Sequence, residues 1–231
     1  MRKSLLFLAA MAISSPAMAA TNLLTNGSFE SNFAGWAVVQ AGGGTAPVVI
    51  PYGSGSQYPG GAFGEAILPN TVSSLSPDVV GNSVAYFSSD TANPHSISQI
   101  VNLVAGTMYN IGFDYYAPRN GIDNPFDASL AFFVGGAPVG ATLTAGQASG
   151  TPAQTWRNFN TSFVATTTAP TTFQFQFRGL GSTAADFAVD RVYAVGAVPE
   201  PATWLMMILG FGGIGFSMRR KQQLFPRLRF A

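Results

Sequence analysis

Strict alternation of aromatic and polar residues is the feature that most limits how this chain can fold. In the stretch "YNIGFDYY", every second residue from Tyr109 to Tyr115 is apolar, and the residues between them are Asn, Gly and Asp. The stretch "TFQFQFRG" alternates in the same way from Phe173 to Arg178. A period of two residues is that of a β-strand with one buried face, and no segment of residues 20–197 keeps a helical period. The sequence therefore predicts an all-β domain here.

Shorter runs rich in β-branched and aromatic residues predict the remaining strands. Turn-forming stretches such as "GSGSQYPGG" and "NGIDNPFD" separate them. These additional strands are expected at residues 36–40, 84–87, 97–104, 129–134, 156–163 and 187–195. About eight short strands in one domain predict an antiparallel jelly-roll β-sandwich, with Trp36 and Trp156 in its core and Gln174 and Gln176 on an outer face.

The N-terminal stretch "MRKSLLFLAAMAISSPAMAA" has the pattern of a secretory signal peptide. Two basic residues precede a short apolar run, Pro16 breaks that run, and Ala17-Met18-Ala19 supplies the small residues of a cleavage site. We therefore expect residues 1–19 to be removed, so that the mature chain begins at Ala20. The chain contains no cysteine, which excludes disulfides, a thiolate metal site and a cysteine nucleophile.

At the other end of the chain, the apolar run 202–218 is followed by Arg219, Arg220 and Lys221. As a helix this run would span about 25 Å, against about 30 Å for the hydrocarbon core of a membrane. The sequence predicts a single C-terminal transmembrane helix whose basic cluster, with the tail 222–231, stays in the cytoplasm. The alternative is a last buried helix of a soluble domain, although an apolar run with no polar face disfavours it.

Three glycines of this run, Gly210, Gly212 and Gly215, satisfy the pattern G-x-G-x-x-G of dinucleotide-binding turns. That turn needs a second strand and an acidic residue further along the chain. No acidic residue follows Glu200. We therefore interpret the glycines as sites of helix packing in a membrane.

Charge separates the ends of the chain from its middle. Residues 20–198 hold four arginines and nine acidic residues, a net charge of −5, whereas the whole chain has a net charge of +1. An acidic exported domain is a poor candidate for nucleic-acid binding.

The stretch "VPEPATWLMMILGFGGIGFSMRRKQ" resembles the PEP-CTERM protein-sorting signal in its PEPxxWA form. The residues that match are Pro199, Glu200, Pro201 and Trp204, followed by the apolar run and by Arg219, Arg220 and Lys221. Leu205 stands where the signal usually has Ala. The resemblance implies a sorting signal over residues 198–221. It also implies an exosortase, a membrane-embedded protease-transpeptidase, as partner, and a Gram-negative host that makes extracellular polysaccharide.

The middle of the chain resembles the galactose-binding-like jelly rolls, which include carbohydrate-binding modules. The residues that carry this resemblance are "NGSFE", ending at Glu30, and "FAVDRVYAV", in which Asp190-Arg191-Val192 replaces the usual Asp-Asn-Val. The family implies a structural Ca²⁺ between the first and last strands, with Glu30 and Asp190 at the matching positions. Oxygen ligands of this kind suit calcium. The alternative is that both are solvated carboxylates at strand ends.

Catalytic candidates are few. His95 is the only histidine, lies in the loop-like stretch "TANPHSIS", and has no G-x-S-x-G motif to accompany it, so we expect a surface loop residue. No motif singles out a pair of carboxylates for glycoside hydrolysis. We expect no enzymatic activity.

Sugar binding would need an aromatic ring that faces solvent beside polar groups. Tyr116 follows the inward-facing Tyr115, so it is expected to point outward, near Arg119, Asn120 and Asp123. Tyr52, Tyr58 and Phe126, which lie in expected loops, are further candidates.

The sequence as a whole predicts an exported protein that passes transiently through the inner membrane. It is then sorted to the cell surface or extracellular matrix, where its β-sandwich binds carbohydrate. Two alternatives stay open, a structural or spacer protein without a small ligand and a glycan-active enzyme.

Overall fold

The protein is described here from a computed structural model. The structure describes residues 21–42, 45–53, 66–89, 91–118, 128–145, 154–179, 185–197 and 201–221. The chain divides into two units, of which Ala20–Ala197 is one, and the segments before and after it form the other. All the strands described lie in Ala20–Ala197. The expected signal peptide, residues 1–19, and the tail, residues 222–231, lie outside the described residues.

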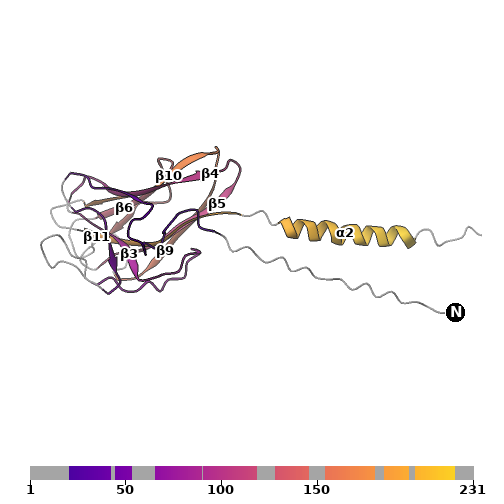
Figure 1. The fold of residues 1–231 in the computed structure, drawn as a ribbon, viewed down its shortest axis with the longest axis horizontal. Helices are drawn as coiled ribbons and strands as arrows, with labels where there is room; N and C mark the ends of the chain where they lie inside the picture. Colours follow the sequence, from indigo (N-terminus) through magenta and orange to yellow (C-terminus); the bar gives the residue numbers. More distant parts are fainter. Residues whose placement is uncertain are drawn as a thin grey trace, which may run out of the picture. The chain divides into compact units, whose positions relative to one another are not determined.

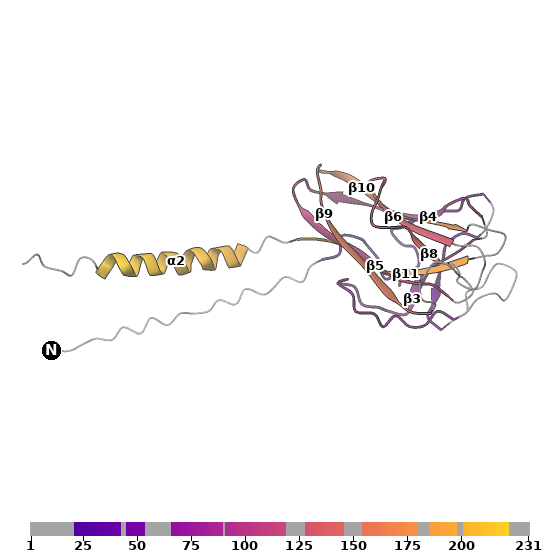
Figure 2. The ribbon, with the colours of Figure 1, turned by 180° about the vertical axis from the view of Figure 1, so that it is seen from behind.

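Two antiparallel sheets form the β-sandwich (Figures 1 and 2). The first sheet has the order β1 (Ala37–Val39), β4 (His95–Leu103), β10 (Ala169–Gly179), β6 (Ala128–Val134) and β7 (Ala137–Pro138), with β8 (Leu143–Ala145) also paired to β6. The second sheet has the order β2 (Val48–Pro51), β3 (Ser83–Ser89), β11 (Ala185–Gly196), β5 (Met108–Tyr116) and β9 (Arg157–Val164). The predicted fold class, an antiparallel jelly-roll β-sandwich, is confirmed.

The main core lies between the two sheets, where the alternating stretches face each other. From β10, Phe173, Phe175 and Phe177 are fully buried. From β5, Phe113 meets Phe175 edge to face, with ring centroids 4.8 Å apart, the geometry that aromatic quadrupoles prefer. Trp36 belongs to the same core. The period of two residues therefore identified the buried faces of both strands correctly.

The predicted strands agree with the structure to within a few residues at each end. Three strands were not predicted, namely β2, β7 and β8, and none of them is longer than four residues. Segments of that length are too short to display a period.

A second, smaller core covers the outer face of the second sheet. It contains Tyr116 from β5, Trp156 just before β9 and Ile67 from the segment 66–80, which runs over this face without regular structure. The indole Nε1 of Trp156 donates a hydrogen bond to the backbone oxygen of Leu68 at 2.7 Å. The second sheet therefore has apolar packing on both faces.

Candidate functional site

The last strand, β11, changes register between Asp190 and Tyr193, which makes a β-bulge. At the bulge Arg191 has a φ of 45°, in the left-handed region that few residues other than Gly, Asn and Asp adopt. The backbone of Val192 lies against Gly27 of the "NGSFE" stretch, and its N–H donates to the oxygen of Gly27 at 3.0 Å. A Cβ added to Gly27 would lie 2.0 Å from the oxygen of Val192, so only glycine fits. The two motifs of the family resemblance therefore meet directly.

The bulge directs the Arg191 side chain into the interior. Its Nε and Nη2 both approach Oδ2 of Asp114 at 2.5 Å, and Nη2 also donates to the backbone oxygen of Val72. The Arg191 side chain is 10% exposed and that of Asp114 is 0% exposed. This buried ion pair joins β11, β5 and the covering segment 66–80.

A second buried carboxylate, that of Asp190, belongs to the same network. Its Oδ2 accepts hydrogen bonds from the Tyr52 hydroxyl at 2.6 Å and from Asn70 Nδ2 at 3.0 Å, and its Oδ1 accepts one from the Arg191 N–H at 2.7 Å. Asn70 Nδ2 also donates to Asp114 at 2.8 Å. Burial raises the pKa of the Asp190 carboxyl to about 7, although the hydrogen bonds from Tyr52 and Asn70 lower it. Burial and the neighbouring Asp190 raise the pKa of the Tyr52 hydroxyl above its usual range.

The two carboxylates implied as calcium ligands, those of Glu30 and Asp190, bind different parts of the protein. Glu30 Oε1 accepts the backbone N–H groups of Asn82 at 2.8 Å and Ser83 at 2.7 Å. None of these donors is shared with Asp190. In the described part of the chain, no three His, Asp or Glu side chains are grouped so that they could hold a metal ion. Because calcium takes about six to eight oxygen ligands, an ion held by this pair would also need backbone or water oxygens, and calcium binding stays a hypothesis for a chelation experiment.

The expected sugar-binding position of Tyr116 is wrong. Its side chain does lie on the opposite face from Tyr115, but it is fully buried, with its ring centroid 5.3 Å from that of Trp156. The segment 66–80 covers this face, so Tyr116 has no access to a ligand. Arg119, Asn120 and Asp123, and also Tyr58 and Phe126, lie outside the described residues.

The expected surface position of His95 is also wrong. His95 begins β4, pairs with Phe177 of β10 and is buried. Its Nε2 lies 3.0 Å from Ser89 Oγ, which is buried as well. This histidine–serine pair is therefore part of the packed interior.

The outer face of the first sheet presents polar side chains. Along β10, Thr172, Gln174 and Gln176 alternate with the buried phenylalanines, and Gln174 lies opposite Phe133 of β6. Gln176 Nε2 donates to Gln174 Oε1 at 2.9 Å. The half-buried residues of this face therefore combine amide and hydroxyl groups with one aromatic ring.

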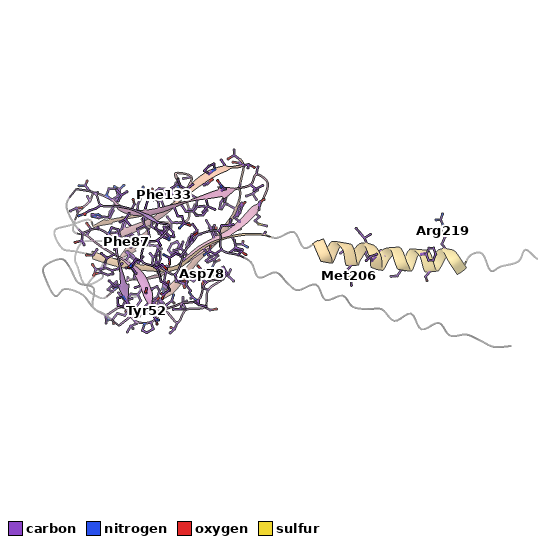
Figure 3. All side chains as sticks on the ribbon, in the orientation of Figure 1. Tyr52, Asp78, Phe87, Phe133, Met206 and Arg219 are labelled. Carbon is purple, nitrogen blue, oxygen red and sulfur yellow. The ribbon has the colours of Figure 1, made fainter. Side chains whose placement is uncertain are left out.

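A surface groove of about 500 Å³ lies on this face, beside β10 and the turn between β6 and β7. The residues that line it are Phe133, Gly135, Gly136, Thr167, Ala169, Pro170, Thr171, Thr172 and Gln174. Gly135 and Gly136 have φ values of 59° and 82°, as a two-residue type I′ hairpin requires. A Cβ on Gly136 would meet no atom within 4 Å. None of these described lining residues carries a charge. Figure 3 labels Phe133 on this side of the sandwich and Tyr52 on the other.

The C-terminal unit contains the sorting-motif residues. Helix α2 (Pro201–Lys221) begins at Pro201, a residue well suited to the first position of a helix. Trp204, Arg219, Arg220 and Lys221 lie within α2, whereas Pro199 and Glu200 lie outside the described residues. Apolar residues from Met206 to Phe216 are exposed along the helix. Among the residues whose placement the structure describes, no helix is both long enough and apolar enough to cross a membrane.

Comparison with protein families identifies the C-terminal segment. Residues 197–221 match the family model described as the PEP-CTERM protein-sorting motif, so the sorting signal predicted from the sequence is confirmed. A search of curated proteins finds no match.

The solved structures to which the chain is similar include carbohydrate-binding modules. One is TmCBM61 in complex with β-1,4-galactotriose, at 18% identity and a TM-score of 0.49, over 77% of this chain and 100% of that one. Another is the family 16 carbohydrate-binding module-2, at 17% identity and a TM-score of 0.44, over 75% and 99% of the two chains. A cyclase from Fischerella sp. TAU is similar at 15% identity and a TM-score of 0.47, over 78% and 100%.

Proposed function

We propose that this protein is exported, recognised by an exosortase through its C-terminal segment, and presented at the cell surface or in the extracellular matrix of a Gram-negative bacterium. The observation that supports this proposal is the PEP-CTERM motif over residues 197–221. Two prolines restrict the backbone on either side of Glu200. Glu200 is also the last acidic residue of the chain, which suits it to specific recognition by the enzyme.

Mass spectrometry of the protein from the surface fraction tests the sorting proposal. In a host with its exosortase, we expect the wild-type protein to have lost its C-terminal segment, and Glu200→Ala to be exported but to keep that segment. Thr203→Ala is the matched control, because Thr203 lies between the motif residues Pro201 and Trp204, and it should be processed normally. A wild-type surface protein that still ends at Ala231 would instead indicate a permanent anchor.

For the β-sandwich we propose carbohydrate binding in the groove on the outer face of the first sheet. Sugars present hydroxyl groups and apolar ring faces, and a binding site needs polar groups to accept and donate hydrogen bonds beside an apolar contact surface. Gln174 and Thr172 offer the polar groups, and the ring of Phe133 offers the apolar contact surface. Because the described residues of the groove lining carry no charge, the ligand class that fits it is a neutral glycan.

A glycan array followed by affinity electrophoresis tests the binding proposal. Phe133→Ala and Gln174→Ala should each weaken binding about tenfold or more, the usual effect of truncating a central contact. Asn160→Ala is the control, because Asn160 is an exposed amide on β9 of the other sheet. If no glycan binds the wild-type protein, the sandwich is a structural or spacer domain. If Asn160→Ala weakens binding and the groove variants do not, the groove is the wrong site.

The proposal assigns the β-sandwich no catalytic role. The fold brings two carboxylates, Asp114 and Asp190, to a shared donor, Asn70, but both are fully buried and engaged with Arg191 and Tyr52. A general acid or base must reach the substrate, and neither carboxylate does. Turnover of a polysaccharide by the purified protein would contradict this assignment.

A further inference from the structure

One end of the β-sandwich exposes a small group of apolar side chains, Val104, Met108 and Val164, which we name the end patch. Their exposed fractions are 54%, 47% and 55%. Met108 of β5 and Val164 of β9 are direct cross-strand partners. Val104 begins the turn that leads into β5, and Gly106 of this turn donates to the oxygen of Ala165 at 2.8 Å. Cross-strand pairing and a backbone hydrogen bond therefore join β5 and the turn before it to the end of β9, the three places from which these apolar side chains come.

The described stretches that form the end patch and adjoin it carry no charge. Residues 101–113, 158–177 and 192–197 contain no Asp, Glu, Lys, Arg or His. These three ranges contribute the turn, both patch strands and the end of β11. Contiguous exposed apolar patches on a protein surface mark sites of interaction with another protein or with a membrane. No charge within these described ranges therefore opposes the burial of this end against an apolar partner.

The end patch lies where the chain leaves the β-sandwich. The N–H of Ala197, the first residue of the sorting motif, donates to the backbone oxygen of Met108 at 2.7 Å. Helix α2 begins four residues later, at Pro201. Four residues span at most about 14 Å in any conformation. A surface that binds the start of the sorting segment is therefore close enough for the end patch to contact it.

We propose that the end patch contacts the surface of the lipid bilayer while the sorting segment is attached. This inference rests on the proposed function, because the exosortase that reads the segment is embedded in the membrane. Apolar side chains at the membrane interface contribute binding in proportion to the area that they bury. Because the surrounding chain is neutral, the contact needs no anionic lipid and should be insensitive to salt. The contact would orient the domain and present the residues between Ala197 and Pro201 at the membrane–water boundary.

The absence of cysteine allows a direct test on the full-length protein. Single substitutions Met108→Cys and Val164→Cys each carry an environment-sensitive fluorophore, and the protein is reconstituted into phosphatidylcholine vesicles. Leu75→Cys is the matched control, because Leu75 is 68% exposed and follows Ser74, whose hydroxyl accepts a hydrogen bond from Asn158. Asn158 is six residues along β9 from Val164, about 20 Å away. Thermal unfolding at the wild-type temperature confirms that each variant is folded.

We expect the labels at positions 108 and 164 to shift to shorter emission wavelength in vesicles and to be quenched by lipid-attached nitroxide, equally at low and high salt. The label at position 75 should stay in water. The bilayer contact is refuted if all three labels behave alike. It is also refuted if the labels at positions 108 and 164 become protected only when exosortase is added, since that outcome identifies a surface of the enzyme as the partner. Protection that appears when the protein is concentrated without vesicles would refute it too, since that outcome identifies a second copy of the chain as the partner. The vesicles contain no exosortase, so a failure of this proposal is distinct from a failure of C-terminal processing.

Discussion

Replacing Arg191 with methionine should be among the most damaging single changes in the β-sandwich. Met is close to Arg in length and is apolar, so it fills the space but removes the charge. Among the described residues, the Asp114 carboxylate would then be fully buried with the amide groups of Asn70 and Asn158 as its remaining side-chain donors. The carboxylate of Asp190 would share Asn70 with it.

The expected loss follows from the burial of the pair. Removing one partner of a buried ion pair costs about 3–5 kcal/mol, because the other charge stays uncompensated. A domain of this kind has a free energy of unfolding of about 5–15 kcal/mol, so Arg191→Met should unfold in much less urea. Adding Asp114→Asn removes the unpaired charge, and the double variant should regain most of the loss, since neutral replacements of buried pairs are often tolerated.

Urea denaturation followed by tryptophan fluorescence measures these changes. Trp156 packs in the small core beside Tyr116 and reports on that side of the second sheet. Arg178→Met is the control, because Arg178 is an exposed arginine of the first sheet. The reasoning is wrong if Arg191→Met unfolds at the same urea concentration as the wild type, or if the double variant is no more stable than the single one.

Other features of the structure lead to further predictions. The pKa of the Asp190 carboxyl in the folded protein, about 7, exceeds the usual 3.8. Asp190 therefore contributes stability that is fully present below about pH 4 and is lost as pH rises through 7. Urea denaturation at a series of pH values should show this loss relative to Asp190→Asn, at up to about 1.4 kcal/mol per pH unit. Since Glu30 and Asp190 already bind protein donors, a chelator should leave the melting temperature unchanged, and a decrease that Glu30→Gln abolishes would instead establish the calcium site. Gly27→Ala should lower the melting temperature markedly, because its Cβ would overlap the Val192 oxygen, and an unchanged value would contradict that contact. Intact-mass analysis should find Ala20 at the N-terminus of the exported chain, not Met1.

The alternating pattern predicted which side of a strand each residue occupies, but not what covers that side. Tyr116 was assigned to the correct face of β5. Its exposure could not be predicted, because Ile67 and the rest of the covering segment belong to a stretch with no regular structure. His95 was missed for a related reason. The polar stretch before it resembles a loop, and only its pairing with Phe177 of β10 places it inside.

The groove could not be predicted from the sequence either, although the positions of its residues within their strands could. Gln174 was correctly expected on an outer face, and Phe133 was within a predicted strand. Their proximity depends on the order of strands, in which β10 lies next to β6. The sequence does not specify that order, because many sheet topologies bury the same alternating residues. The sorting motif, in contrast, consists of neighbouring residues, and it could be recognised without the fold.

The two outer faces of the β-sandwich therefore have different roles, which mutation can separate. The outer face of the second sheet is occupied by its own covering segment and by the Asp114–Arg191–Asp190 network, so changes there act on stability. The outer face of the first sheet has neutral polar residues and a groove, and Phe133 is only partly buried there, so Phe133→Ala should weaken glycan binding with little effect on unfolding. At a temperature where it is still folded, Arg191→Met should bind glycan as the wild type does. If instead Arg191→Met abolishes binding in folded protein, or Phe133→Ala unfolds the domain, then ligand binding and the buried network are not separate, and the groove does not act as an independent site.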